Sequence, residues 1–330
     1  MLYNLVIVSL PPHSVSRRAL RAHGLICTAS DDQNKSSESE IPRVHDCIVV
    51  DYSEAFESDR GNYSHVQTII NTLPSDLTVN QRERAMELIR RNADLFSRGE
   101  FDIGRTHLME ATINTGHAAP IAEPLRRHAK IHLDVIDETV EKLQQAGIVE
   151  ECNAPWSSNL VVVSKPGSST PRITVDLRRL NAVTSRECYQ LPLQTESLEF
   201  LSRSVYLSVL DVSHSYFTVP LHANDRDKTA FTTRRGQCRF CVLPQGAKNS
   251  PAIFSRLMSL VLRGLTYLSA LSFIDDIIVV GRTFDEHLLN LELVFNRFRY
   301  ARLSSNQKMP SIPAGSCLSW SSGHWRKHQY

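Results

Sequence analysis

Residues 267–281 read YLSALSFIDDIIVVG, two apolar runs interrupted by a single pair of acidic residues. This pattern predicts a β-hairpin with Asp275 and Asp276 at its tip and with Gly281 closing the return strand. Two adjacent carboxylates repel each other, and each loses hydration beside the apolar residues around it, so the pair needs a positive partner. A divalent metal ion meets this need, because Mg²⁺ takes oxygen ligands and keeps open positions for substrate phosphates.

A third acid, Asp211, ends the apolar run VYLSVLD at residues 205–211. If this run is a strand paired with the hairpin, three carboxylates meet at one edge of the sheet and could hold two ions about 3.5–4 Å apart. The alternative is that Asp is common in turns, where its side chain bonds the local backbone. Because apolar runs flank the Asp275–Asp276 pair on both sides, these residues do not favour a solvated turn over a metal site.

The sequence around the hairpin predicts further strands and helices. Strand-like runs bounded by Pro, Gly, Ser or Asn lie at residues 160–164, 172–177, 205–211 and 238–244. Ser250 before Pro251 predicts the N-cap and first residue of a helix that ends near Gly264, and Thr283 with Glu286 has capping-box spacing. Strand, helix, hairpin and helix in this order predict an α+β fold, a small antiparallel sheet with helices on one face.

The N-terminal part of the chain is less regular. Residues 5–10 form a short strand-like run, and residues 28–45 are polar enough that we expect part of this segment to be disordered. Thr78 and Gln81 have capping-box spacing and predict a helix. A second amphipathic helix is expected to end at Gly147.

The composition is that of an ordinary globular chain, with 330 residues, 42% hydrophobic and 22% charged residues, and a formal net charge of +2. It excludes collagenous and mucin-like chains, and the length suggests about two structural units. Residues 28–60 hold nine acidic and three basic residues, a local charge of −6 that leaves +8 on the remainder. Seven scattered cysteines favour a reducing compartment over a disulfide framework. No apolar run approaches the ~20 residues of a membrane-spanning helix.

Competing motifs are weak. Cys238 and Cys241 form a CxxC pair, but a structural zinc site needs four ligands. The NTG at residues 114–116 is similar to the DTG of an aspartic protease but lacks its carboxylate. The sequence contains neither a GxGxxG nor a Walker-type loop, which leaves the acidic hairpin as the main chemical signal.

Four longer motifs, taken together, resemble a known family. They are RITVDLRRLNAVT (172–184), VLDVSHSYF (209–217), LPQGAKNSPAIF (243–254) and FIDD (273–276). Their order and spacing resemble those of a reverse transcriptase, and the chain is most similar to the gypsy class of long-terminal-repeat retrotransposon Pol polyproteins. The resemblance implies a right-hand polymerase fold with fingers and an antiparallel palm sheet, here with the thumb missing.

The resemblance also implies the roles of individual residues. It assigns Asp211, Asp275 and Asp276 as the catalytic and metal-binding triad for two Mg²⁺ ions, with Mn²⁺ as a substitute. Tyr216 matches the aromatic steric gate that excludes a ribose 2′-hydroxyl, although a core aromatic is the alternative for this residue. Gln245 matches the glutamine beside the sugar of the incoming nucleotide.

Five further positions carry expectations from the same resemblance. Gly246 matches the residue that lets backbone and nucleotide approach closely. Lys165 and Arg172 correspond to fingers residues that grip the triphosphate, although either alone would be interpreted as a solvated cation. Phe273 occupies a position where many relatives carry tyrosine, and Ile274 is expected beside the primer-terminal nucleotide.

These motifs divide the chain into three expected parts. Residues 1–104 correspond to a linker after a protease, residues 105–308 to the reverse transcriptase fingers and palm, and residues 309–330 to an aberrant tail unlike the family. The implied function is RNA-directed DNA polymerase, with an RNA or DNA template–primer and deoxynucleoside triphosphates as partners and no membrane. The alternative is an inactive retroelement remnant that at most binds nucleic acid or a partner. The family implies cytoplasmic particles followed by nuclear entry.

Overall fold

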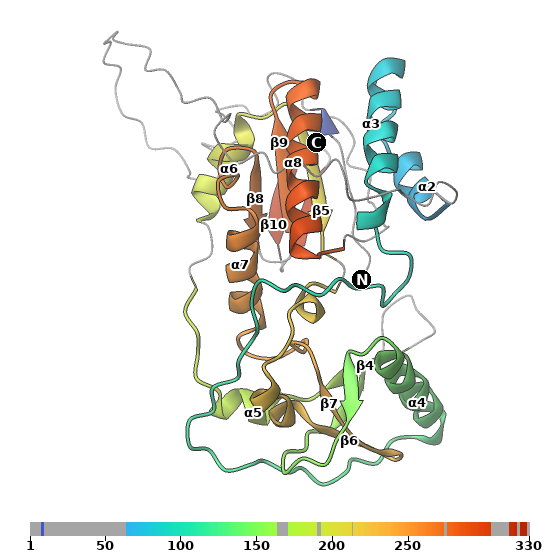
Figure 1. Cartoon of the computed structure of the whole chain (residues 1–330), viewed down its shortest axis with the longest axis vertical. Helices are drawn as coiled ribbons and strands as arrows, with labels where there is room; N and C mark the ends of the chain where they lie inside the picture. Colours follow the sequence, from blue (N-terminus) through green and yellow to red (C-terminus); the bar gives the residue numbers. More distant parts are fainter. Residues whose placement is uncertain are drawn as a thin grey trace.

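The computed structural model describes residues 64–163, 171–189, 193–212, 214–273 and 276–304, together with the strands β1 (Val8–Ser9), β10 (Cys317–Ser321) and β11 (His324–His328). Only the backbone is described for these three strands and for Gln194 and Asp211. The described elements form two lobes joined by extended segments (Figure 1). The upper lobe contains the sheet that carries Asp211 and Asp276, and the lower lobe contains small sheets and α4 (Lys130–Gln145).

The upper sheet has four antiparallel strands in the order β1, β5 (Tyr206–Asp211), β9 (Asp276–Gly281) and β8 (Ala270–Phe273). β8 and β9 form the predicted hairpin, and Gly281 closes its return strand. β5 pairs with β9 along its full length, which confirms that the strand ending at Asp211 joins the hairpin. β1 adds an edge strand, with Val8 opposite Leu207.

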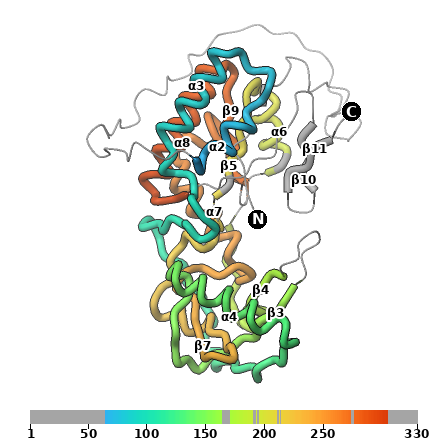
Figure 2. The backbone as a smooth tube through the Cα atoms, turned by 90° about the vertical axis from the view of Figure 1, so that its right-hand side faces the viewer, coloured from blue at the N-terminus to red at the C-terminus, as the bar shows by residue number. Residues whose placement is uncertain are grey.

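Two long helices, α7 (Ser250–Val261) and α8 (Phe284–Ala301), pack on one face of this sheet (Figures 1 and 2). The sheet positions that alternate toward them are apolar, as strand periodicity requires, and Leu210, Ile277 and Val279 are fully buried there. The opposite face carries a smaller cluster with α6 (Gln194–Ser202). Its buried members are Leu201, Leu207, Ile278 and Val280. The expected α+β layout is confirmed, with the two long helices on one face as predicted and the short α6 in addition on the opposite face.

The ends of α7 and α8 differ from the sequence expectation in detail. The N-cap of α7 is Asn249, not Ser250, because the Ser250 hydroxyl donates to the carbonyl of Pro244 and Ser250 is already helical. Thr283 caps α8 as expected, accepting from Glu286 N–H. The Glu286 carboxylate, however, accepts from the backbone N–H of Arg282, one residue before the cap.

Two N-terminal helices, α2 (Ser64–Asn71) and α3 (Val79–Arg91), pack beside α8 with the 3₁₀ turn η2 (Ala93–Leu95) (Figure 2). The Thr78–Gln81 capping box that opens α3 is present with both hydrogen bonds. The rings of Phe96 and Phe295 meet edge to face with centroids 5.8 Å apart. These contacts place residues 64–96 in the same hydrophobic cluster as α7 and α8.

The lower lobe is built from short strands around the amphipathic α4. One sheet has the order β2 (Val149–Glu151), β7 (Gly236–Phe240) and β6 (Phe231–Thr233), and a separate pair joins β3 (Leu160–Val163) to β4 (Arg172–Val175). β7 starts and ends earlier than the predicted 238–244 run. Ile136 and Val140 of α4 are buried against these strands, and Gly147 follows the helix with φ +62°.

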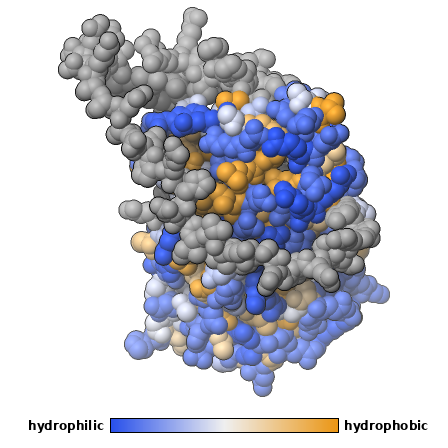
Figure 3. Space-filling model, turned by 45° about the horizontal axis from the view of Figure 1, so that its top comes forward, coloured by the Kyte–Doolittle hydropathy of each residue, from blue (hydrophilic) through white to orange (hydrophobic). Residues whose placement is uncertain are grey.

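The remaining elements are the short helix α5 (Arg178–Val183) and the 3₁₀ turns η3 (Ser215–Thr218) and η4 (Ala223–Thr229). β10 and β11 pair with each other inside the 309–330 segment, while the expected disordered stretch at 28–45 lies outside the described residues. None of the described helices combines the length and apolarity needed to cross a membrane. The face seen in Figure 3 is mostly hydrophilic, with a larger apolar area on the upper lobe and smaller apolar spots elsewhere.

Candidate functional site

Asp276 of the hairpin and Asp211 of β5 lie in one row of the upper sheet. Asp211 pairs directly with Asp276 in the β5–β9 ladder, and Phe273 pairs with Asp276 in the β8–β9 ladder. Asp276 is half-buried and Phe273 is 5% exposed. Ile274 and Asp275, which complete the hairpin tip, lie outside the described residues.

The donor set at this row suits a hard divalent cation. Paired positions of an antiparallel ladder lie on the same face of the sheet and close together, so the register brings two carboxylate-bearing positions to one place. Among the side chains that the structure describes, no three His, Cys, Asp or Glu residues form a metal-binding group. The side chain of Asp211 and all of Asp275 are not among them. Carboxylate oxygens are the ligands that Mg²⁺ prefers.

Tyr216 lies on η3, five residues beyond Asp211, and is half-buried. Its ring meets the ring of Phe254 edge to face at 6.0 Å, and Phe254 is a fully buried residue of α7. The turn before it is tight, because His214 adopts a left-handed conformation with φ 44°. The contact with α7 fixes the Tyr216 ring relative to the acidic row.

The segment joining β7 to α7 crosses from the lower to the upper lobe (Figure 1) and carries Gln245 and Gly246. It is fastened to the chain just after Tyr216 by an antiparallel bridge between Pro220 and Val242 and by Leu243 N–H donating to Val219 O at 2.9 Å. The residues expected beside a nucleotide are therefore held near the Tyr216 segment by backbone hydrogen bonds.

Gly246 has φ +91°, a conformation that side-chain-bearing residues rarely adopt. No described atom lies within 4 Å of the position that a Cβ would take. The requirement for glycine therefore comes from the backbone conformation, and the space beside Gly246 is open on that side.

Arg172 and Gln245 are in contact, although they are 73 residues apart. Arg172 is an exposed residue of β4, and its guanidinium donates to the Gln245 side-chain oxygen. The lower lobe thus contributes a cation directly beside the Gln245–Gly246 segment. Lys165, the other predicted triphosphate ligand, lies outside the described residues.

A further cation near β4 is neutralised locally. Arg178 donates to both carboxylate oxygens of Asp176, at 2.8 and 2.6 Å. The hydrogen bonds from Arg178 hold the pKa of Asp176 below its ordinary value. Asp176 therefore stays charged and pairs with Arg178 at the start of α5, which leaves Arg172 as the β4 cation bound to the Gln245 segment.

Three residues of this region were not singled out from the sequence. Asn181, Lys248 and Asn249 link α5 and the chain after it to the segment that carries Gln245 and Gly246. Each lies inside one of the quoted motifs, so the signal was present in the sequence. That the two motifs touch could be learned only from the tertiary structure.

The CxxC residues do not form a metal site. Cys238 and Cys241 are buried, at 4% and 9% exposure, and burial raises the pKa of Cys238 to about 11. The pKa of Cys241 is also raised, first by burial and then by the carboxylate of Glu150. Both thiols are protonated at neutral pH and belong to the core of the lower lobe.

A buried polar pair links α8 to β5, the strand that carries Asp211. The His287 ring on α8 lies 2.7 Å from the Ser208 hydroxyl on β5, and both residues are fully buried. Burial lowers the pKa of His287 to about 4, so the ring is neutral at neutral pH. This contact joins α8 to the strand that ends, three residues later, at Asp211.

Comparison with known proteins identifies the region. Residues 163–309 match the reverse transcriptase (RNA-dependent DNA polymerase) family. The chain is 31% identical over 202 residues to the retrovirus-related Pol polyprotein from transposon 297 of Drosophila melanogaster, covering 60% of this chain and 19% of that protein. It is 34% identical over 175 residues to the Pol polyprotein from transposon opus of the same organism, covering 52% and 17%.

Solved structures of low sequence identity share the fold. The structure of the foamy viral protease-reverse transcriptase in complex with RNA/DNA hybrid has a TM-score of 0.69 and 23% identity, covering 77% of this chain and 34% of that chain. The dsDNA complex of the same viral protein has a TM-score of 0.64 and 24% identity, covering 73% and 50%. The predicted partial right-hand polymerase fold is thereby confirmed.

The resemblance to transposon Pol polyproteins of the gypsy type is also confirmed, since a gypsy Pol polyprotein is 28% identical over 180 residues, covering 53% of this chain and 17% of that protein. The chain spans about a fifth of the length of the curated relatives that it matches. The family match over residues 163–309 contains β5, the hairpin and the Gln245 segment. The chain therefore contains a reverse transcriptase region of the retrotransposon Pol type.

Proposed function

We propose that this chain catalyses template-directed addition of deoxynucleotides to the 3′-hydroxyl of a primer, as an RNA-directed DNA polymerase. The observation that carries the proposal is the direct pairing of Asp211 with Asp276, next to the Asp275 position, in a chain of the reverse transcriptase family. Primer, template and deoxynucleoside triphosphate are the proposed substrates, and the fold similarity to a viral reverse transcriptase supports this choice.

Asp211, Asp275 and Asp276 are proposed to hold Mg²⁺ or Mn²⁺. When bound, the ions would supply positive charge that lowers the pKa of the primer hydroxyl and offsets the charge of the leaving pyrophosphate. In the reaction, the 3′-oxygen forms a bond to the α-phosphorus, the bond from that phosphorus to pyrophosphate breaks, and the hydroxyl proton leaves to solvent. Atoms and charge balance without any redox partner.

The other residues are proposed to bind and orient the nucleotide. Arg172 is exposed and planar, with several N–H donors suited to phosphate oxygens, and Lys165 would add a point charge. Gln245 and Gly246 would lie beside the sugar, where the open side of Gly246 leaves room for a ligand. The Tyr216 ring, fixed against Phe254, would exclude a 2′-hydroxyl by contact. Phe273 and Ile274 would contact the primer end.

Primer extension by the purified chain tests the proposal. The assay uses an oligo(dT) primer on poly(rA), Mg²⁺ and labelled dTTP, with wild type, Asp275→Asn and Asp285→Asn compared. Asp285 is an exposed acid on α8 and provides a matched control. Incorporation by wild type and the control, abolished in Asp275→Asn, supports the polymerase. Absence of incorporation by folded wild type at every protein and metal concentration supports the inactive remnant instead.

A further inference from the structure

The loop Pro244–Asn249, called here the QG loop, is fastened to α5 by side chains that the reaction itself does not use. We propose that Asn181 and Lys248 are positioning residues that set the conformation of the QG loop and thereby the affinity for the incoming nucleotide. This inference rests on the proposed function, because it assumes that Gln245 and Gly246 bind the nucleotide.

Asn181 bonds the QG loop with both ends of its side-chain amide. Its Nδ2 donates to the carbonyl of Gly246 at 2.8 Å, and its Oδ1 accepts from the backbone N–H of Lys248 at 2.8 Å. With donor and acceptor both engaged, the amide orientation is determined by the loop that it holds. The peptide that follows Gly246, the residue with φ +91°, is thus fixed from α5.

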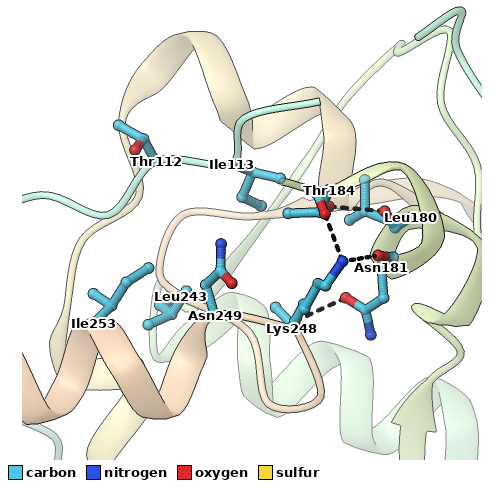
Figure 4. A pocket seen from close by; sticks show the side chains of 10 residues that line it. Thr112, Ile113, Leu180, Asn181, Thr184, Leu243, Lys248, Asn249 and Ile253 are labelled. Atoms are coloured by element: carbon cyan, nitrogen blue, oxygen red, sulfur yellow. Dashed lines mark hydrogen bonds between the residues drawn. The ribbon is translucent and has the colours of Figure 1, made fainter. Parts of the chain in front are cut away.

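Lys248 makes the reciprocal connection. Its Nζ donates to the carbonyls of Thr184 at 2.7 Å and Asn181 at 3.2 Å, at the C-terminal end of α5 (Figure 4). An ammonium at this end of a helix satisfies carbonyls that have no partner within the helix. Lys248 therefore has a structural task in the described chain, and its charge is directed at backbone oxygens.

Asn249, just before α7, adds two hydrogen bonds between the QG loop and the chain that follows α5. Its Nδ2 donates to Ser185 O at 2.9 Å, and its Oδ1 accepts from Glu187 N–H at 3.1 Å. The cavity lined by Asn181, Lys248 and Asn249 and by apolar residues such as Ile113 and Leu243 has a volume of only about 10 Å³ (Figure 4), room for about one water molecule. The contacts thus form a closed joint and leave no space for a nucleotide between α5 and the loop.

The contacts of Asn181 on α5 and of Arg172 on β4 both reach the QG loop from neighbouring elements of the chain. β4 and α5 are separated by only two residues, so Arg172 and Asn181 belong to one continuous segment of the chain. Arg172 holds the side chain of Gln245, and Asn181 holds the carbonyl of Gly246. The position of the loop relative to the fingers is therefore set at both residues that are proposed to meet the nucleotide.

The test compares Asn181→Ala and Lys248→Met with Asn71→Ala, an exposed asparagine of α2 remote from the loop. For each protein, kcat and KM for dTTP, the Kd for template–primer, and amide hydrogen exchange of residues 244–249 are measured. We expect Asn181→Ala and Lys248→Met to raise KM by about 3- to 10-fold, because each removes side-chain hydrogen bonds between α5 and the QG loop. Exchange in the loop should rise, with kcat within about 2-fold and an unchanged template–primer Kd.

The outcomes separate this inference from the proposed function. An unchanged KM together with faster loop exchange would overturn the positioning role while leaving the polymerase intact. A weaker template–primer Kd in Lys248→Met, with KM unchanged, would show that Lys248 binds nucleic acid directly and would also overturn it. No incorporation by wild type overturns the function and, with it, this inference. Should Asn181→Ala fail to fold, Lys248→Met decides the question, because position 248 is exposed and methionine keeps most of the apolar stem of the lysine.

Discussion

Asp211 and Asp276 are directly paired residues of the β5–β9 ladder, although 65 positions separate them in the sequence. Like charges at directly paired positions destabilise a sheet by roughly 0.2–1 kcal/mol. An acidic pair at this register is therefore a cost to folding that a bound cation would remove. This relationship leads to the first prediction.

Asp211→Asn and Asp276→Asn should each lower primer extension by more than about 100-fold, because each removes a proposed metal ligand. In the metal-free protein the same changes should raise the free energy of unfolding by up to about 1 kcal/mol, because the repulsion is relieved. Urea unfolding in EDTA and primer extension in Mg²⁺ measure the two effects. Asp285→Asn is the control, and a loss of stability in both site variants would contradict the pairing argument.

Arg172 and Gln245 should act as a coupled pair. Arg172→Ala and Gln245→Ala are each expected to raise KM for dTTP. The increase in KM of the double variant should be about 2- to 10-fold smaller than the product of the two single increases, because the hydrogen bond can be lost only once. A double-mutant cycle on KM measures this coupling. The matched cycle uses Arg178→Ala with Gln245→Ala, since Arg178 pairs with Asp176 instead. Strictly independent effects of Arg172 and Gln245 would show that the contact is unimportant in the active protein.

His287 should make stability depend on pH between about 4 and 6.5. The pKa of His287 is about 4 in the native chain, and its ordinary value is 6.5. Between these pH values the His287 ring is protonated in the unfolded chain and neutral in the native chain. Stability is therefore complete above pH 6.5 and is lost as the pH falls toward 4, by up to about 3 kcal/mol. Chemical unfolding at a series of pH values measures the slope.

His287→Gln should reduce that slope within this window and leave the part due to His214 and His128, whose pKa values burial also lowers, whereas His117→Gln, a change at an exposed histidine, should leave the slope as in wild type. The window matters because carboxylates with a lowered pKa, such as Asp176, contribute only at lower pH. An unchanged slope in His287→Gln would place the titrating group elsewhere.

Gly281→Ala should destabilise the upper lobe. A Cβ at Gly281 would lie 2.6 Å from both Cα and Cβ of His287, a backbone contact that α8 cannot avoid without moving. Overpacking of this kind costs about 1–3 kcal/mol. Thermal or urea unfolding measures the loss, and Gly99→Ala is the control, because no described atom lies within 4 Å of the place that its Cβ would occupy and its φ is not positive. Equal stability of the two variants would contradict the close packing of β9 on α8.

Local patterns predicted most of the elements that position the site. The single acidic pair between two apolar runs predicted the β8–β9 hairpin, and the spacing of Thr78 with Gln81 predicted the capped start of α3. These features depend on residues close together in the sequence, whose preferences act before any tertiary contact forms. The prediction of Ser250 as the N-cap was wrong because its hydroxyl donates to the carbonyl of Pro244. A capping preference read from the local sequence does not include this competing hydrogen bond.

The sequence by itself predicted the family that the region resembles and the acidic residues proposed to bind metal, since motifs and residue types are local. Only the tertiary structure decided that Asp211 meets Asp276, that Arg172 meets Gln245, and that Asn181 holds Gly246. Each of these contacts joins residues more than 60 positions apart. Such pairs are selected by strand register and by core packing of the whole lobe, which no short window of sequence encodes.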